Sequence, residues 1–344
     1  MSGRAHCGRP GLGEELAMQV SVIVPVYNGE HTLRGCLDAL VAQDASGIDV
    51  EVLVVDNGST DGTWELINSY GAPIRGLQET RLRGSYAARN TGIAASRGQI
   101  VAFTDADCVP NSHWLERLVA GFDDPRVGCV GGQVIGLPPR TAAEVFAQRK
   151  GVLNQEMAFK GSYRPHFATA NVAYRREVLE QLGGFEASLE SGGDADLCWR
   201  MQEETDWQIR FEPGALVEHH HRVNWRDLWK QYHRYGRGRA ALRVLHPRHP
   251  VTRYETLSET LRRLGRLTRR AIAYSFAWPL SPIRGRPSRE EMDYAFYALI
   301  SQGAFALGAR RGPSRPVYRS AKPLVDDKQP VVPGEALSEG QPSR

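Results

Sequence analysis

Three short, mostly apolar runs rich in β-branched residues divide the first third of the chain. They occupy residues 20–26 (VSVIVPV), 50–55 and 100–104, and leucines at helical spacing follow the first run in residues 30–43. A nearly continuous apolar run is typical of a strand that is buried on both faces of a parallel sheet. Strands that alternate with helices therefore predict an α/β fold with a mostly parallel sheet flanked by helices.

A polar cluster follows each of these runs. Tyr27 and Asn28 follow the first run, Asp56 follows the second, and an Asp-Ala-Asp segment at residues 105–107 follows the third. In open α/β sheets, ligands bind outside the carboxyl ends of the strands. The topology therefore brings the three clusters to one edge of the sheet and predicts a ligand site there.

Asp105 and Asp107 form an Asp-X-Asp pair directly after a strand. Their carboxylates are hard oxygen ligands, which suit Mg²⁺ or Mn²⁺ held jointly with substrate phosphates. A solvated loop is the alternative explanation, and the pair alone does not decide between the two.

Asp56 also has two interpretations. Its carboxylate can accept a hydrogen bond from a nucleobase N–H group at the mouth of the sheet. Alternatively, it belongs to a loop in which Ser59 or Thr60 caps the next helix, although such a cap needs no aspartate at position 56.

Composition excludes several classes of protein. The chain has 344 residues, a formal net charge of +4 and five scattered cysteines without a CxxC pair. So small a charge argues against a nucleic-acid partner, and the cysteines argue against a disulfide framework or zinc site and for a reducing compartment. Residues 1–17 lack the apolar core of a secretory signal, so we expect a cytoplasmic protein. The sequence does not decide whether translation starts at Met1 or Met18.

The regular alternation weakens after residue 127. Just before this point, Pro110 is expected to open a helix that carries Trp114, Leu115 and Leu118. The later segments predict strands at residues 127–135, 168–174 and 215–218, and helices at residues 176–182, 194–204 and 225–242. We also expect a flexible extension at residues 1–17, a basic helical region at residues 241–311 and a disordered tail at residues 312–344.

The basic helical region contains an amphipathic pattern. Leucines alternate there with arginines, namely Leu257, Leu261, Leu264 and Leu267 with Arg262, Arg263, Arg266, Arg269 and Arg270. The pattern fits a helix on an anionic membrane surface, and equally a helix that packs on the rest of the protein with a solvated basic face. Residues 294–309 are apolar but shorter than the roughly 20 residues of a spanning helix, which favours a buried or membrane-dipping helix.

Four segments follow one another in a distinctive order: VSVIVPVYNGEHTL, VLVVDNGSTDGT, GSYAARNTGIAASRGQIVAFTDADC, and NVAYRREVLEQLGGF with GGDADLCWR after it. Together they resemble the family 2 glycosyltransferases over residues 19–238. The resemblance implies a GT-A-type, Rossmann-like catalytic domain at residues 18–240, followed by a helical C-terminal appendage. It also implies a nucleoside-diphosphate sugar as the donor.

The resemblance assigns roles in donor binding to five residues. Pro25, Tyr27 and Asn28 would line the pocket for the nucleobase and ribose, and Asp56 would bind the base. Arg89 would sit near the diphosphate or support the Asp-X-Asp loop, with an ordinary surface salt bridge as the alternative.

The same resemblance implies a divalent cation, Mg²⁺ or Mn²⁺. Asp105 would contact the ribose or the metal, and Asp107 would be the principal metal ligand. The family often has a metal-contacting histidine after a later strand, where His219 fits best, although the run of three histidines leaves the register ambiguous. Residues 231–239 resemble the family's helix near the acceptor site, where basic residues can hold the departing diphosphate.

Asp194 occupies the position of the family's catalytic base in GGDADLCWR. The family motif is commonly Gly-Glu-Asp-X-Asp-Leu, and Gly193 replaces its glutamate here, which puts the acceptor contacts in doubt more than the reaction type. A carboxylate at a helix start on the pocket wall can take the proton of an acceptor hydroxyl. The alternative is a carboxylate that only stabilises the helix N-terminus, a role that fits Asp196 better than Asp194.

The resemblance therefore implies an inverting glycosyltransferase that transfers a sugar to a hydroxyl of a glycan, a lipid-linked acceptor or a small molecule. Cell-envelope or polysaccharide biosynthesis would be its setting, in the cytoplasm or at the cytoplasmic face of a membrane. A sugar nucleotidyltransferase is one alternative, but it needs a Gly-rich, basic loop where this chain has VYNGEHT. A non-catalytic carbohydrate-binding protein is another, and the four aspartates 56, 105, 107 and 194 argue against it. No residue identifies the sugar, the base or the acceptor.

Overall fold

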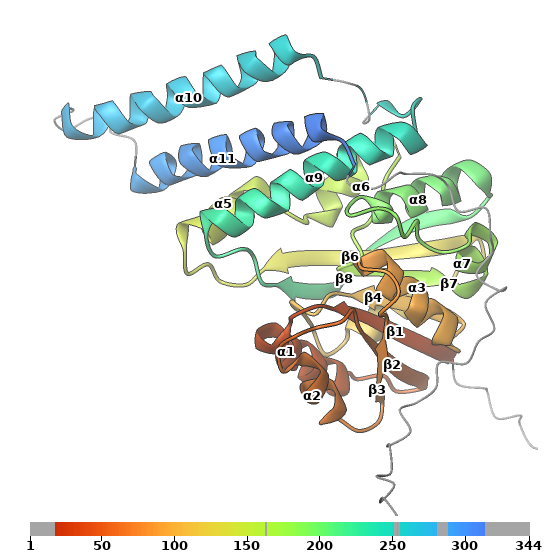
Figure 1. Cartoon of the computed structure of the whole chain (residues 1–344). Helices are drawn as coiled ribbons and strands as arrows, with labels where there is room; N and C mark the ends of the chain where they lie inside the picture. The colour runs from red at the N-terminus through yellow and green to blue at the C-terminus, as the bar shows by residue number, and fades with distance from the viewer. Residues whose placement is uncertain (1–17, 162–163, 251–252, 254, 281–287, 314–344) are drawn as a thin grey trace, which may run out of the picture.

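An eight-stranded sheet, in the order β3-β2-β1-β4-β7-β6-β8-β5, organises the molecule (Figure 1). The computed structural model describes residues 18–161, 164–250, 253, 255–280 and 288–313. The flexible extension predicted at residues 1–17 and nearly all of the disordered tail predicted at 312–344 lie outside the described residues.

Four parallel strands form the N-terminal half of the sheet, and β1 lies between β2 and β4. Both faces of β1 are buried, because Val22 and Val24 pack in one core and Ile23 packs in the other. The continuous apolar run follows from this double burial. The predicted alternation is confirmed by the elements β1 (Met18–Val26), α1 (Glu30–Val41), β2 (Ile48–Asp56), α2 (Thr63–Asn68), β3 (Ile74–Gln78), α3 (Ser85–Ala95) and β4 (Ile100–Thr104).

The second half of the sheet is mixed. β7 (Asn171–Arg175) runs antiparallel to β4 and to β6 (Val127–Gly136), and β6 is parallel to β8 (Gln208–His219).

The prediction that Pro110 opens a helix is wrong. Pro110 ends the short edge strand β5 (Cys108–Pro110), where it pairs with Val217, and the helix α4 (Trp114–Ala120) begins four residues later. An edge strand tolerates a proline because one side of its backbone needs no partner.

Helices cover both faces of the sheet. α1, α2 and α4 bury their apolar sides in one core, whereas α3, α7 (Arg176–Leu182) and α8 (Gly193–Glu204) bury theirs in the other. Two short helices, α5 (Ala142–Lys150) and α6 (Gln155–Gly161), were not predicted. A capping box of Thr141 and Glu144 begins α5, and this Thr-X-X-Glu spacing is the sequence signal that reveals it.

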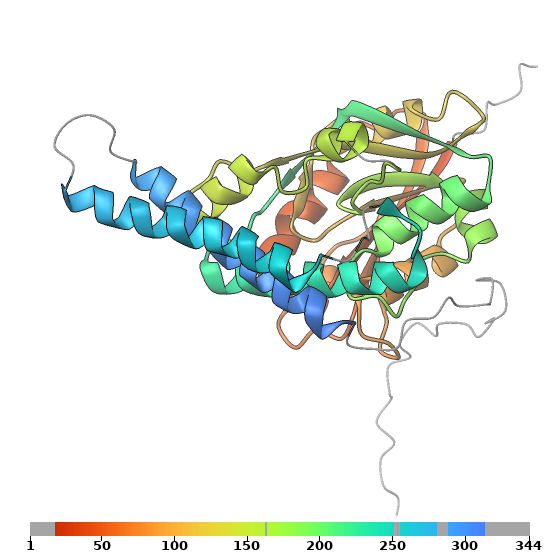
Figure 2. The same ribbon diagram turned by 90° about the horizontal axis from the view of Figure 1, so that it is seen from above.

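Three long helices follow the sheet: α9 (Trp225–Leu245), α10 (Leu257–Leu280) and α11 (Arg289–Arg311). α11 packs closely on α9, since a Cβ atom added to Gly236 would lie 2.1 Å from the Phe305 carbonyl oxygen. α10 lies along α11 on the side away from the sheet (Figures 1 and 2). The apolar residues 294–309 are thus part of a buried helix interface, where Ala304 is fully buried. Within the described residues, none of the helices has the length and apolar character needed to span a bilayer.

Candidate active site

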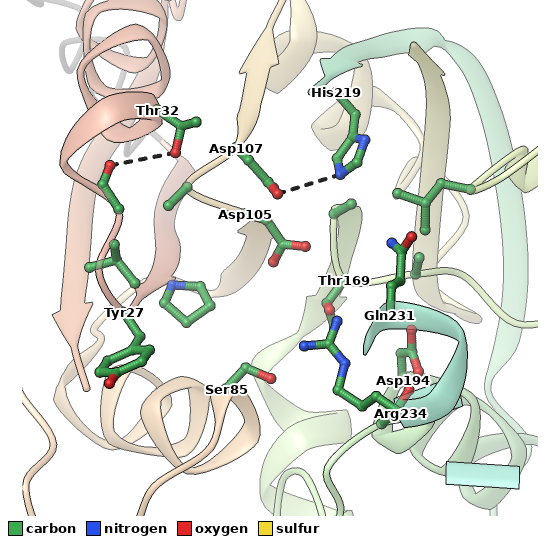
Figure 3. Close-up of a pocket in the computed structure, with 18 of the residues that line it drawn as sticks. Tyr27, Thr32, Ser85, Asp105, Asp107, Thr169, Asp194, His219, Gln231 and Arg234 are labelled. Carbon is green, nitrogen blue, oxygen red and sulfur yellow. Dashed lines mark hydrogen bonds and ion pairs between the residues drawn. The ribbon is translucent and has the colours of Figure 1, made fainter. Parts of the chain in front are cut away.

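A cavity of about 690 Å³ opens at the carboxyl ends of β1 and β4. Figure 3 shows side chains from several elements, among them Tyr27, Asp107 and Asp194, arranged around it. Eight of the nine residues predicted from the sequence line this cavity: Pro25, Tyr27, Asn28, Arg89, Asp105, Asp107, Asp194 and His219.

The acidic pair lies in the turn between β4 and β5, which the Cys108 backbone N–H closes by donating to the Asp105 carbonyl at 3.0 Å. The buried Arg89 guanidinium donates to the Asp105 carboxylate. Arg89 therefore pairs with Asp105 from a buried position, so the alternative of an ordinary surface salt bridge is wrong. On the other side, Asp107 Oδ2 lies 3.6 Å from His219 Nε2 and 3.5 Å from Arg222 Nη2.

The surroundings affect the two carboxyl groups differently. Burial raises the pKa of Asp105, and the nearby Asp107 charge adds to this effect while Arg89 opposes it. Burial also acts on Asp107, but the charges of His219 and Arg222 outweigh it and lower the pKa of Asp107 to about 2. Asp107 is therefore ionised at neutral pH and faces the cavity.

The three consecutive histidines have different environments. His220 is exposed, whereas His219 and His221 are buried. His219 directs Nε2 towards Asp107, and its Nδ1 lies 3.2 Å from Nδ1 of His221. Burial lowers the pKa of His221 to about 4, so this ring is neutral at physiological pH. A neutral partner on Nδ1 fixes the orientation of the His219 ring, and this geometry selects His219 from the three.

The residues around the acidic pair fit a divalent cation. Ligand atoms of Asp105, Asp107 and Cys108 all lie within 4.8 Å of one another. Burial raises the pKa of the Cys108 thiol, which therefore stays protonated and is a poor metal ligand. Two carboxylates and a neighbouring imidazole remain, and this set of ligands suits Mg²⁺ or Mn²⁺.

The two aspartates of α8 lie in opposite environments. Asp194 faces the cavity, where the Tyr86 hydroxyl donates to its carboxylate at 3.4 Å. Asp196 is 1% exposed, accepts a hydrogen bond from Arg200 Nε at 2.9 Å and lies 2.9 Å from His246 Nε2. Asp196 is thus committed to an internal ion pair rather than to the helix N-terminus, and Asp194 alone of the two can meet a ligand.

Tyr86 also explains why the glutamate of the family motif is missing. A Cβ atom added to Gly193 would lie 2.8 Å from the Tyr86 ring, so the tyrosine occupies the space that a side chain at position 193 would need. Tyr86 is buried and stacks on Phe185 with a centroid separation of 5.6 Å. The aromatic ring and the glycine are therefore a matched pair beside Asp194.

Asp56 is the one predicted residue that does not line the cavity. It is 1% exposed, and its carboxylate accepts hydrogen bonds from the Ser59 backbone N–H at 3.1 Å and from the Ser59 hydroxyl. The prediction that Ser59 or Thr60 caps the next helix is wrong, because the N-cap of α2 is Gly62 without a side-chain cap. Ser59 instead accepts from the Asn28 backbone N–H at 2.8 Å and so joins Asp56 to the loop after β1.

Among the cavity residues that the sequence did not predict, Tyr86 and Arg222 matter most, because they lie beside Asp194 and Asp107. Arg222 follows the three histidines directly, so its position beside Asp107 could have been inferred once the His219 register was known. Tyr86 carries no signal in the sequence, because its contact with Asp194 joins residues 108 positions apart. Of the basic segment at residues 231–239, Arg234 lines the cavity and Arg237 pairs with Glu190 at 3.3 Å.

This combination of fold and site defines a class of enzyme. An Asp-X-Asp turn at the end of a parallel strand, a histidine beside it and a separate aspartate on the opposite wall are the features of a GT-A-type glycosyltransferase. The family model described as glycosyl transferase family 2 matches residues 21–183. The chain belongs to this family.

Known relatives agree with this assignment. The glycosyltransferase AglE of Haloferax volcanii is 38% identical over 231 residues, which cover 66% of this chain and 74% of AglE. A pre-mycofactocin glycosyltransferase of Mycobacterium tuberculosis is 34% identical over 238 residues, which cover 66% of this chain but only 48% of that relative. The mannosyltransferase PcManGT of Pyrobaculum calidifontis, solved in complex with GDP-Man and Mn²⁺, has a TM-score of 0.56 at 25% identity, covering 84% of this chain and 86% of its own. The nucleotidyltransferase and carbohydrate-binding alternatives are therefore set aside.

Proposed function

We propose that the protein is an inverting glycosyltransferase, which transfers a sugar from a nucleoside-diphosphate donor to an acceptor hydroxyl. One observation carries the proposal: the acidic pair and Asp194 open into the same cavity from different elements. The complex of PcManGT with GDP-Man and Mn²⁺ supports a nucleotide sugar and a divalent cation as partners of this fold. Residues 18–240 would form the catalytic domain and residues 241–311 the helical appendage.

At one side of the cavity, Asp105, Asp107 and His219 would hold the cation and, with it, the donor diphosphate. When bound, such a cation neutralises charge on the leaving diphosphate. Arg222, which lies 3.5 Å from Asp107, adds a guanidinium on the same side. Pro25, Tyr27 and Asn28 would line the space for the ribose and base.

At the other side, Asp194 would accept the proton of the attacking hydroxyl. Its Oδ2 atom keeps free lone pairs, because the Tyr86 hydroxyl and the Ala195 backbone N–H both donate to Oδ1. A base on the wall opposite the leaving diphosphate places the nucleophile on the far face of the sugar, which inverts the anomeric centre. Donor hydrolysis tests the proposal: nucleotide sugars incubated with Mn²⁺ should release the nucleoside diphosphate, and a panel that releases none would refute it.

Asp56→Ala is expected to weaken binding of the nucleoside diphosphate by about 1.5–3 kcal/mol, the value of a hydrogen bond to a charged group. The reason is that the resemblance assigns Asp56 to the base. Because Ser59 holds the carboxylate below the cavity surface, beside the Asn28 loop, this contact requires the Ser59 segment to shift when the nucleotide binds. Titration calorimetry with UDP and GDP measures the effect, and the Mn²⁺ requirement should not change. Ser59→Ala is the matched control, because it loosens the same loop but keeps the carboxylate. Full affinity in Asp56→Ala would mean that the base binds elsewhere.

We further propose that α10 associates with an anionic membrane surface, such as a cytoplasmic leaflet. Its outer side exposes Leu257, Leu261 and Ile272, which are 60%, 58% and 49% accessible. In flotation experiments the protein should remain on anionic vesicles at low salt and dissociate as ionic strength rises. Replacing Arg269 and Arg270 with glutamine should weaken this retention. Equal retention on neutral vesicles would rule out the electrostatic attachment.

A further inference from the structure

A second cavity, of about 540 Å³, adjoins the catalytic cavity at Asp194. The two share Leu153, Ala168, Ser191, Asp194 and Tyr235. Beyond these residues the wall of the second cavity is largely apolar and includes Met157, Trp199, Leu242 and Phe305. Few sugar hydroxyl groups would find partners there, whereas an aliphatic or aromatic group would be well accommodated. This apolar cavity begins where the accepting hydroxyl would meet the proposed base.

A third cavity, of about 250 Å³, continues from the second and shares Arg239 and Phe305 with it. Its charged lining consists of Arg239 and Arg243 from α9, Arg253 and Glu255 from the segment after α9, Arg263 from α10 and Arg310 from α11. Five guanidinium groups therefore face one carboxylate across segments of the chain that are far apart in sequence. We call it the arginine cavity.

Two of these arginines, Arg239 and Arg263, have incomplete hydrogen bonding among the described residues. Arg263 donates to Glu255 at 2.8 Å and also to Gln302, yet its Nε is buried without a partner. Arg239 is partly buried, and among the described residues its guanidinium makes neither a hydrogen bond nor an ion pair. Burial and the neighbouring Arg243 both lower the pKa of Arg239, which means that its surroundings disfavour the charge. A partly desolvated cation without a partner is stabilised when an anion binds to it.

The geometry of α9 connects this cavity to the catalytic one. Tyr235, Arg239 and Arg243 are spaced four residues apart on one side of the helix. At 1.5 Å per residue, Arg243 lies about 12 Å along the axis from Tyr235. Gly238 lets this part of α9 pack closely against the segment before α8. A Cβ atom at position 238 would lie only 2.5 Å from the Ser191 carbonyl oxygen. A ligand that lies along α9 from Tyr235 to Arg243 therefore spans about this length.

We infer that the arginine cavity binds a phosphate-class anion carried by the sugar acceptor, and that the apolar cavity holds the part of the acceptor between this anion and its reactive hydroxyl. The guanidinium group matches phosphate oxygens with paired, charge-assisted hydrogen bonds, which is why several arginines favour this ligand. The inference rests on the proposed function, because it takes Asp194 as the place where the hydroxyl reacts. The acceptor is thus an amphipathic phosphate rather than a neutral polysaccharide.

Binding is tested first, by titration calorimetry with decyl phosphate, inorganic phosphate and 1,10-decanediol. Decyl phosphate should bind at least tenfold more tightly than either of the others. Arg239→Gln and Arg310→Gln should each weaken the binding of decyl phosphate about tenfold or more. This is the change in affinity expected when one hydrogen bond to a charged group is lost. Arg269→Gln, an exposed arginine of α10 outside the arginine cavity, is the matched control and should bind as the wild type does. Equal losses in Arg239→Gln and Arg269→Gln, or tighter binding of inorganic phosphate than of decyl phosphate, would overturn the inference.

Transfer is tested next, with 10-hydroxydecyl phosphate as acceptor and the donor that the wild type hydrolyses. The wild type should glycosylate this acceptor and leave 1,10-decanediol almost unmodified. Arg239→Gln should raise KM for the acceptor about tenfold with little change in kcat. If no donor is hydrolysed but decyl phosphate binds through Arg239, the proposed function fails and the anion site stands. If donor hydrolysis is normal but decyl phosphate binding ignores Arg239, the inference fails and the proposed function stands.

Discussion

Asp107→Asn is expected to abolish the Mn²⁺-dependent part of donor binding and to slow sugar transfer by about 10³-fold, because several kcal/mol of charge stabilisation at the diphosphate are lost. The substitution keeps the shape of the side chain and removes its charge. Asp107 is the carboxylate best suited to a cation, since its neighbours lower its pKa to about 2 and it stays ionised over the whole neutral range. Its carboxylate also faces the cavity from a turn that the backbone fixes (Figure 3).

Titration of the nucleoside diphosphate at several Mn²⁺ concentrations measures this effect directly. Asp123→Asn is the matched control, because Asp123 is 72% exposed and pairs with Arg210 away from the cavity. Asp105→Asn is a useful comparison: it leaves the buried Arg89 without its carboxylate, so we expect a lower melting temperature in addition to weaker binding. An Asp107→Asn protein that still binds the nucleotide more tightly with Mn²⁺ than without it would contradict the assignment.

The parts of the fold that could be predicted are those in which local sequence and tertiary environment agree. β1 and β4 are apolar on both faces because both faces are buried, and β4 and α7 have the predicted bounds. The error at Pro110 has a different origin. Its extended conformation depends on pairing with Val217, more than one hundred residues later, and no local pattern contains that information. The local sequence also does not show that β7 lies between β4 and β6 and runs antiparallel to both, because this too depends on pairing with distant strands.

The residues of the site also fall into those that local sequence predicts and those that only the folded structure brings together. Asp105, Asp107 and Asp194 could be predicted because strand ends and a recognisable helix start bring them to the cavity. Asp56 follows a strand end as well, but Ser59 binds its carboxylate and draws it below the surface of the cavity. The arginine cavity is the extreme case. Arg239 and Arg310 come together because Gly236 and Gly308 let α9 and α11 approach closely, and this packing exists only in three dimensions.

Asp194→Asn is expected to lower transfer by roughly 10²–10⁴-fold, the usual effect of losing a general base. Donor binding should stay near the wild-type value, because the nucleotide and its diphosphate contact the opposite side of the cavity. Until the natural acceptor is known, donor hydrolysis provides the assay, since an attacking water must also lose a proton. Nucleotide affinity measured in parallel separates loss of the chemical step from loss of the substrate.

Asp196→Asn makes this prediction specific. Asp196 is buried against Arg200 and His246, so its loss leaves a buried cation unpaired and should destabilise the fold by roughly 3–5 kcal/mol. Burial opposes ionisation of Asp196, but the hydrogen bond from His246 and the charge of Arg200 outweigh it and lower the pKa of the carboxyl group. The stabilisation that the ion pair gives is therefore present at neutral pH and is lost as the pH falls through the pKa of the folded state. The two variants should therefore fail in different ways. Asp194→Asn should keep the wild-type melting temperature and lose the catalytic rate, whereas Asp196→Asn should have a lower melting temperature and keep the rate while it is folded. If Asp194→Asn reacts at the wild-type rate, the base lies elsewhere, and the histidines after β8 are the next residues to replace.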